Sequence, residues 1–167
     1  MSTPKLELIA LKKEFADGSV AAVDGIDLTI EEGQTLALLG PSGCGKSTTL
    51  NMIVGLEQPS LGDIRIDGKS VVAVPPGQRN VGLVFQDYAV FTSMSVRDNL
   101  AFGLKVRGQR RREIDRAVGE IAELLGLSTM LNIGARDLGG SELQRVAIGR
   151  TLVTRPAILL LDEPLSN

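Results

Sequence analysis

Residues 40–47 carry the residue types that chemistry on phosphates requires. Their sequence, GPSGCGKS, matches the pattern G-x-x-x-x-G-K-[ST] and lies between an apolar run and a predicted helix. Glycines let backbone N–H groups turn inward around a phosphate, and a helix N-terminus adds positive potential. Lys46 would then place its charge on the β- and γ-phosphates of a nucleotide, and the Ser47 hydroxyl would bind Mg2+. The alternative, a glycine turn before an ordinary helix, gives this pattern by accident in roughly one chain in a hundred or fewer.

Two adjacent carboxylates, Asp162 and Glu163, end a second apolar run, AILLLDEP. If this run is a strand beside the strand that leads into residues 40–47, Asp162 faces the Mg2+ shell and Glu163 addresses the water that attacks the γ-phosphate. By itself, a strand that ends in polar residues is the more ordinary interpretation. Because the same chain also carries the phosphate-loop pattern, the pair favours nucleotide hydrolysis.

The composition excludes several other chemistries. The chain has 167 residues, no histidine and one cysteine. Ser-His-Asp triads, His-ligated zinc, multi-cysteine metal sites and an intramolecular disulfide are therefore excluded. A hydrophobic content of 43% and a net charge of -2 are typical of one soluble globular domain. The basic run RGQRRR at residues 107–112 is interpreted as a solvated face between helices. We expect neither a secretion signal nor a membrane-spanning segment.

Strand patterns of two kinds surround these residues. Alternating patterns predict antiparallel edge strands, whereas short continuous apolar runs predict central parallel strands that are covered on both faces. The alternating segments are residues 5–11, 23–30 and 62–69, with turns at Asp17-Gly18 and Asp67-Gly68. The continuous segments are residues 35–40, 80–86 and 157–162.

Helical patterns follow the phosphate-loop motif and dominate residues 87–142. A helix is predicted from about Lys46 to Gly55, and apolar residues at helical spacing predict another over residues 112–126. A further helix is predicted from Ser141, where Gln144 can reach back to form a capping box. These patterns indicate an α/β nucleotide-binding core with a helical insertion.

Four motifs in this order resemble those of the ATP-binding subunits of ABC transporters. They are GPSGCGKS, LVFQDYAVF at residues 83–91, LGGSELQRVAIGRTL at residues 138–152, and LLLDE at residues 159–163. The resemblance runs from about Leu6 to the last residue and is greatest to the subgroup that energises carbohydrate and glycerol-phosphate importers. It implies a P-loop NTPase fold: a RecA-like core with an antiparallel β edge subdomain, formed by residues 1–86 and 143–167, and an ABC-specific helical subdomain, residues 87–142. It also implies that the chain binds ATP and Mg2+ and hydrolyses ATP to drive solute uptake.

The resemblance assigns roles to single residues. Phe15 matches the aromatic residue that stacks on adenine, Val20 is its neighbour, and Gln86 matches the glutamine that touches Mg2+ and the attacking water. The implied catalytic residues are Glu163, Lys46 and Gln86, and the implied metal ligands are Ser47, Gln86 and Asp162. The implied nucleotide-binding residues are Phe15, Val20, Gly40, Pro41, Ser42, Gly43, Cys44, Gly45, Lys46, Ser47, Thr48 and Gln86.

The resemblance also implies partners. The chain would pair with a second copy or another ATP-binding subunit and would lie at the cytoplasmic face of the cell membrane as a peripheral protein. Residues 87–96 would border the groove that receives the coupling helix of an integral membrane permease, although FTSM departs here from the usual Tyr-Pro-His-Met. An extracytoplasmic solute-binding protein would act through the permease, and no nucleic acid is expected.

The chain departs from the family pattern at the signature motif, which usually reads Leu-Ser-Gly-Gly-Gln. This chain has Leu138, Gly139, Gly140, Ser141 and Glu142 at these positions. In the family this motif caps the γ-phosphate bound to the other subunit. Glu142 would bring negative charge to that phosphate unless its side chain turns away. Ser141 is expected to cap its helix.

The second departure is the point where the chain ends. After EPLSN the family continues with an aspartate-bearing loop, another strand, the switch histidine and, in sugar importers, a regulatory domain. We therefore expect an incomplete nucleotide-binding domain. Two alternatives stay open at this point: a module that binds nucleotide without turnover, and a soluble ABC-type ATPase that acts on nucleic acid, the latter supported only by RGQRRR.

Overall fold

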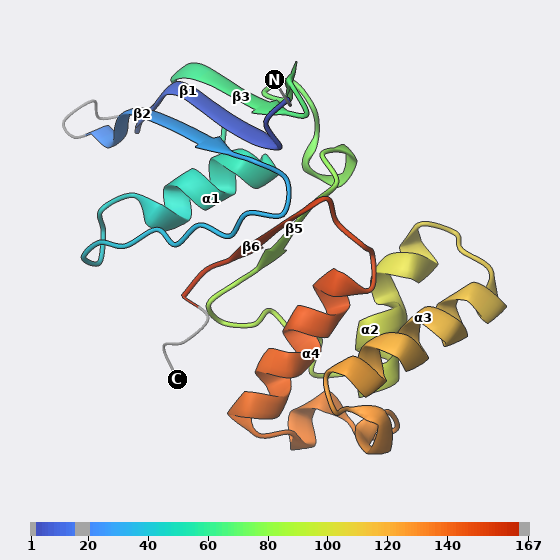
Figure 1. The fold of residues 1–167 in the computed structure, drawn as a ribbon. Helices are drawn as coiled ribbons and strands as arrows, with labels where there is room; N and C mark the ends of the chain where they lie inside the picture. The colour runs from blue at the N-terminus through green and yellow to red at the C-terminus, as the bar shows by residue number, and fades with distance from the viewer. Residues whose placement is uncertain (1–2, 16–20, 164–167) are drawn as a thin grey trace. The chain divides into compact units, whose positions relative to one another are not determined.

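A computed structural model describes residues 3–15 and 21–163 of the chain. The chain divides into two compact units, Met1–Val81 and Gly82–Asn167. In Figure 1 the first unit consists of strands β1–β4 with helix α1, and the second is mainly helical. The predicted assignment of residues 1–86 and 143–167 to one core, with residues 87–142 as an insertion, stays a prediction.

The elements follow the chain in mixed α/β order. The strands are β1 (Leu6–Glu14), β2 (Ala21–Ile30), β3 (Leu61–Ile66), β4 (Lys69–Ser70), β5 (Val81–Val84) and β6 (Ile158–Leu161). The α-helices are α1 (Lys46–Val54), α2 (Val96–Val106), α3 (Arg111–Leu124) and α4 (Gly140–Leu152), and short 3-10 helices span Pro76–Gln78, Ser128–Met130 and Ala135–Asp137. In the described part of the chain, none of the helices combines the length and the apolar character that crossing a lipid bilayer requires.

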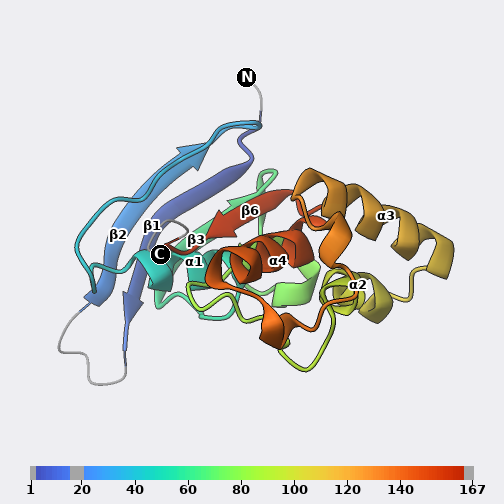
Figure 2. The ribbon, with the colours of Figure 1, turned by 90° about the horizontal axis from the view of Figure 1, so that it is seen from below.

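The first unit contains a four-stranded antiparallel sheet in the order β2-β1-β3-β4. Figure 2 shows β1 between β2 and β3. The sheet confirms the alternating strand patterns. It also confirms the turn at Asp67-Gly68, whose φ angles of 49° and 72° are those of a tight hairpin between β3 and β4. The other predicted turn, Asp17-Gly18, lies outside the described residues.

The core of the first unit forms where α1 packs along one face of this sheet (Figure 1). Strand β1 contributes Leu6, Leu8 and Leu11, and α1 contributes Met52 and Ile53, all of which are buried. The helix ends as predicted at Gly55, whose φ of 92° is left-handed and whose N–H donates to the Asn51 carbonyl at 3.0 Å.

The carboxyl end of α1 is held by Arg79, a residue that the sequence patterns did not single out. Its guanidinium donates to the carbonyls of Met52 (2.7 Å), Ile53 (3.1 Å), Val72 (3.1 Å) and Val74 (2.7 Å). The side chain is 3% exposed, and this burial lowers the pKa of Arg79. A cation here satisfies helix carbonyls that have no intrahelical partner and complements the negative end of the helix dipole.

Residues 35–40 do not form the central strand that their apolar run predicts. No strand is assigned to residues 34–40, and Leu36, Leu38 and Leu39 are exposed, the last by 91%. An apolar run becomes a strand only when a neighbouring strand supplies hydrogen-bond partners and another layer covers its side chains. None of the described strands pairs with this segment.

The second unit contains a two-stranded sheet of β5 and β6. Figure 1 shows both strands running in the same direction, and the Asp162 N–H donates to the Val84 carbonyl at 3.0 Å just beyond β6. The strands predicted at residues 80–86 and 157–162 are therefore confirmed. The prediction that β6 is covered on both faces is wrong: Leu160 is buried, but its neighbours Leu159 and Leu161 are exposed. Side chains alternate between the two faces of a strand, so only one face is covered.

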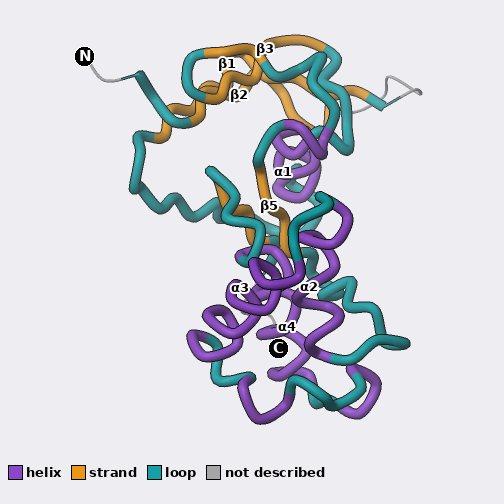
Figure 3. The backbone as a smooth tube through the Cα atoms, turned by 90° about the vertical axis from the view of Figure 1, so that its right-hand side faces the viewer, coloured by secondary structure: helices purple, strands orange, loops and turns teal. Residues whose placement is uncertain are grey.

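Helices α2, α3 and α4 pack together and build the core of the second unit (Figure 3). Helix α3 confirms the helical pattern at residues 112–126. At Gly149 of α4 an added Cβ would lie 2.6 Å from the end of the Leu100 side chain on α2 and 2.9 Å from that of Leu125, so a larger residue here would require these side chains to shift. The buried residues of this core are Val96, Leu100, Ala101, Leu104, Ile114, Val118, Ala122, Leu127, Ala135, Leu138, Val146 and Val153.

Helix α4 starts earlier than predicted. Its N-cap residue is Gly139, and the Glu142 carboxylate accepts the Gly139 N–H at 2.7 Å. Ser141 is therefore the second residue of the helix rather than its cap, and Glu142 takes the part predicted for Gln144. The acid of a capping box lies three residues after the N-cap, so moving the cap from Ser141 to Gly139 moves the acid from Gln144 to Glu142.

Candidate nucleotide-binding site

The predicted phosphate loop turns tightly before it enters α1. Gly43 and Gly45 have left-handed φ angles of 80° and 93°, and Gly45 is the N-cap residue of α1. An added Cβ at Gly45 would lie 2.2 Å from the Ala22 carbonyl oxygen, so no residue other than glycine fits without a backbone shift. The first helical hydrogen bond follows at once, from the Thr49 N–H to the Gly45 carbonyl at 2.9 Å. The left-handed backbone at Gly43 and Gly45, and the close approach of Ala22 to Gly45, therefore explain why glycine stands at these two positions.

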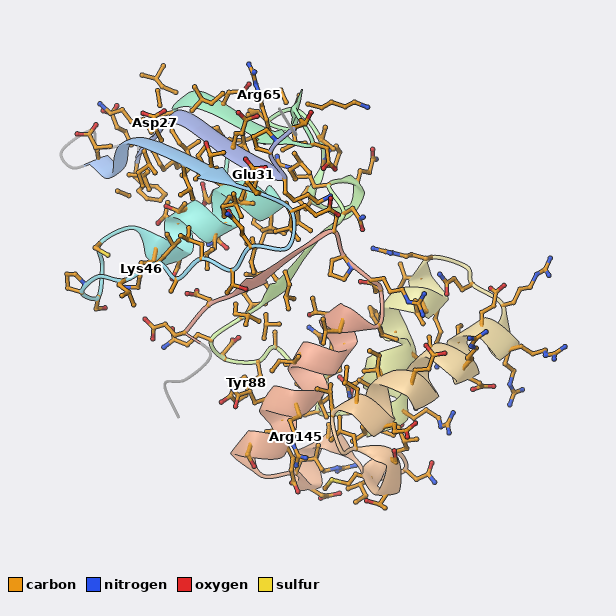
Figure 4. All side chains as sticks on the ribbon, in the orientation of Figure 1. Asp27, Glu31, Lys46, Arg65, Tyr88 and Arg145 are labelled. Atoms are coloured by element: carbon orange, nitrogen blue, oxygen red, sulfur yellow. The ribbon has the colours of Figure 1, made fainter. Side chains whose placement is uncertain are left out.

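The Lys46 side chain turns back across the loop that precedes it (Figure 4). Its Nζ donates to the carbonyls of Gly40 and Pro41, both at 2.9 Å, and lies 3.8 Å from the Cys44 Sγ. Ser47 and Thr48 follow it in the first turn of α1. The exposed residues of the loop are Gly40, Pro41, Ser42, Gly43 and Cys44. An exposed loop that ends in a helix N-terminus and carries an ammonium group suits a bound phosphate chain.

Gln86 and Glu163, both predicted to be catalytic, are in direct contact although 77 positions separate them. The Gln86 Nε2 donates to the Glu163 Oε2 at 2.9 Å. Gln86 occupies a β-turn closed by the Tyr88 N–H and the Phe85 carbonyl at 3.0 Å, and Glu163 has a left-handed φ of 46°. The structure thus places an amide beside the carboxylate that sequence analysis assigns to the attacking water.

Asp162 precedes Glu163 and is half-buried, whereas Glu163 is exposed. Both carboxylates follow β6, and Gln86 follows β5, so the three side chains lie beyond the carboxyl ends of two neighbouring strands. Ligands of α/β proteins bind at this end of the strands. The sequence positions alone predicted this arrangement for Asp162 and Glu163.

The predicted Mg2+ ligands have suitable chemistry. A hydroxyl (Ser47), an amide oxygen (Gln86) and a carboxylate (Asp162) are hard oxygen donors of the kind that Mg2+ prefers. Ser47 belongs to the first unit, and Gln86 and Asp162 belong to the second. That the phosphate loop and the carboxylates form one site therefore stays a prediction. Within residues 3–15 and 21–163, no three or more His, Cys, Asp or Glu side chains gather to hold a metal ion.

The predicted adenine contact is described only in part. The Phe15 ring follows β1 and is 47% exposed, and the Lys13 Nζ lies 5.1 Å from its centroid. Such an exposed ring offers a face for stacking. Val20 lies outside the described residues.

Sequence analysis missed Arg150, which contacts the segment that follows Gln86. Its Nη1 donates to the Ala89 carbonyl at 2.6 Å, and burial lowers its pKa. A usable signal was present in the sequence, because Arg150 lies four residues after Val146 and three before Val153, which places it on the buried face of α4.

Comparison with known proteins gives a consistent result. The sequence model of the ABC transporter family matches residues 23–166. The trehalose/maltose import ATP-binding protein of Thermococcus litoralis is 51% identical over 97% of the chain and 45% of its own length. An sn-glycerol-3-phosphate import ATP-binding protein of Rhizobium johnstonii is 49% identical over 97% of the chain and 46% of its own length. The spermidine/putrescine import ATP-binding protein of Frankia alni is 49% identical over 98% of the chain and 36% of its own length. The chain thus spans less than half the length of these relatives.

Solved structures show the same fold. A nucleotide-free ATP-binding cassette from an ABC transporter aligns with a TM-score of 0.86 and 26% identity, over 98% of this chain and 70% of its own. The ADP conformation of another such cassette aligns with a TM-score of 0.87, at the same identity and coverage. These similarities confirm the predicted fold class.

Proposed function

This chain belongs to the ABC transporter family, and on that premise we propose that it is the ATP-binding part of an importer subunit. It binds Mg-ATP through residues 40–47, pairs with a second ATP-binding subunit, and hydrolyses ATP to drive solute uptake. The observation that carries this proposal is the phosphate loop itself, whose left-handed Gly43 and Gly45 lead into α1 and whose Lys46 ammonium lies across it.

Within the loop, the backbone N–H groups and the Lys46 ammonium hold and orient the phosphates. Lys46 exchanges the carbonyls of Gly40 and Pro41 for phosphate oxygens, which are the stronger acceptors because they are charged. Ser47, Gln86 and Asp162 would be the ligands of Mg2+, which would neutralise charge on the phosphates when bound. Phe15 and Val20 hold the adenine.

For hydrolysis, Glu163 is the general base that accepts a proton from the attacking water at its carboxylate. The hydrogen bond from the Gln86 amide to the Glu163 Oε2 supports this role, because it orients the carboxylate. A glutamine that contacts both the base and the metal shell can place the water in line with the phosphate.

The similarity to import proteins supports the choice of partners. The three relatives described above are named for import of trehalose and maltose, of glycerol phosphate, and of polyamines, at nearly equal identity. We therefore propose an importer whose membrane permease and solute-binding protein select the solute, a sugar or related compound being the first candidate. The ATP-binding part lies at the cytoplasmic face of the membrane.

The test is ATP binding by the Lys46→Ala variant, measured by calorimetry. We expect affinity to fall by about 100-fold, the equivalent of about 3 kcal/mol from one strong charged contact. Circular dichroism should show an unchanged fold, because the Lys46 hydrogen bonds lie in an exposed loop. Lys69→Ala, in the exposed strand β4 of the same unit, is the matched control and should bind as the original chain does. Equal affinity of Lys46→Ala and Lys69→Ala would refute the loop assignment.

One observation favours a second candidate, a module that binds nucleotide without turnover. The Glu142 carboxylate accepts the hydrogen bond of the Gly139 N–H at the start of α4, where the signature motif of the family offers N–H groups to a phosphate. Phosphate release no faster than that of the Glu163→Gln variant, together with retained ATP binding, would select this candidate.

A further inference from the structure

The segment between Gln86 and α2 adopts an unusual backbone. Directly after the β-turn that holds Gln86, Tyr88 and Ala89 have φ angles of 62° and 45°. Two consecutive residues with side chains in the left-handed region are costly, since the Cβ atom of each crowds its own backbone. Such a conformation persists only where surrounding contacts hold it.

One contact comes from α4. The Arg150 Nη1 donates to the Ala89 carbonyl at 2.6 Å, and the guanidinium carbon lies 4.6 Å from the centroid of the Phe91 ring. The Phe91 ring in turn packs against Phe102 of α2, with centroids 4.7 Å apart. Arg150 is half-buried, so both contacts are partly shielded from water and correspondingly strong.

A second contact comes from α2. The fully buried Asn99 receives the Phe91 N–H at 2.9 Å through its Oδ1 and donates its Nδ2 to the Phe91 carbonyl at 3.0 Å. Phe91 is thus fixed at both its backbone groups. Asn99 thus holds Phe91, and Arg150 contacts Ala89, which lies between Phe91 and the turn that carries Gln86.

We propose that Arg150 is a positioning residue for Gln86. By holding the Ala89 carbonyl it keeps Tyr88 and Ala89 left-handed, and this backbone path aims the Gln86 amide at the Glu163 carboxylate. The catalytic meaning of the contact rests on the proposed function, in which Glu163 is the base. The claim that Arg150 positions Gln86 concerns contacts within the chain and does not depend on ATP binding or hydrolysis.

The test is NMR of the 15N-labelled full chain without nucleotide, so that it stays independent of ATP binding. The observed signal is the side-chain amide of Gln86, identified as the one that Gln86→Glu removes. In the original chain, Glu163→Gln changes the acceptor of this amide and should shift its signal. In an Arg150→Met background, this response to Glu163→Gln should be lost, while backbone signals of α2 and α3 stay in place.

Arg145→Met is the matched control. Arg145 also lies on α4 and donates to a backbone carbonyl, that of Leu125 at 3.2 Å, away from the segment after Gln86. The Gln86 response should survive in Arg145→Met. If Arg150→Met does not fold, Arg150→Gln takes its place, because its side chain ends two atoms short of the guanidinium nitrogens.

A rescue experiment distinguishes loss of the Gln86 position from a general loss of packing around Arg150. Glycine adopts positive φ without the cost that alanine has, so Ala89→Gly in the Arg150→Met background should return part of the Gln86 response. A full response in Arg150→Met or Arg150→Gln would overturn the proposal, and so would a loss that Ala89→Gly leaves unchanged. Failure of the chain to bind or hydrolyse ATP would overturn the proposed function and leave this result standing.

Discussion

Replacing Arg79 by methionine should destabilise the unit that carries the phosphate loop. The Arg79 guanidinium makes four hydrogen bonds to backbone carbonyls, two of them at the end of α1. Methionine has a similar length and apolar stem but no donor. The variant therefore leaves all four carbonyls without this partner, those of Met52 and Ile53 in a buried environment and those of Val72 and Val74 in a partly buried one.

The magnitude follows from the two opposing contributions. Hydrogen bonds from a charged donor contribute about 1.5–3 kcal/mol each, so four give about 6–12 kcal/mol. Burial of the ion costs several kcal/mol, and the fall in the pKa of Arg79 reflects that cost. A net loss of about 3–5 kcal/mol remains, which is a large part of the total stability of a domain, about 5–15 kcal/mol.

Urea unfolding followed by circular dichroism measures this loss. Arg65→Met is the matched control, because Arg65 lies in the same unit but is exposed and pairs with Asp63 at 2.8 Å on the surface. We expect the control to leave the free energy of unfolding nearly unchanged, because the pair is exposed. If Arg79→Met lowered the free energy of unfolding by less than about 1 kcal/mol, with an unchanged dependence of that free energy on urea concentration, the view that Arg79 holds the end of α1 would be wrong.

Two further predictions concern helix starts in the second unit. Glu142→Ala should reduce stability by about 1 kcal/mol, measured by urea unfolding, because the Gly139 N–H loses its acceptor, and Glu142→Gln should restore most of it; equal losses would contradict the cap. Hydrogen bonds from Lys105 and from Ser95 keep the pKa of Asp98 below its ordinary value. The stability gained from Asp98 is therefore present near pH 7 and lost as pH falls through its lowered pKa. The Lys105 and Asp98 side chains are each about half exposed, so Asp98→Asn should lower the free energy of unfolding by only about 0.5 kcal/mol at pH 7. A stability difference between Asp98→Asn and the original chain that persists undiminished to about pH 3 would contradict this prediction.

Local patterns predicted those elements whose cause is local. Helix α1 and its end at Gly55, the hairpin at Asp67-Gly68 and helix α3 depend on apolar spacing and on glycine at left-handed positions, which neighbours in the chain largely determine. The sequence also predicted the residue types at the candidate site, because phosphate and Mg2+ binding restrict which residues can serve.

The sequence by itself therefore determined the family, the phosphate-loop motif and the identity of the carboxylates. Only the tertiary structure decided that residues 35–40 carry no strand, that Glu142 caps α4, and that Arg79 and Arg150 hold distant backbone carbonyls. It also decided that Gln86 meets Glu163. The physical reason is common to all of these: a strand, a cap or a buried donor is defined by its partner, and the chain positions of partners are not encoded in the spacing around either one.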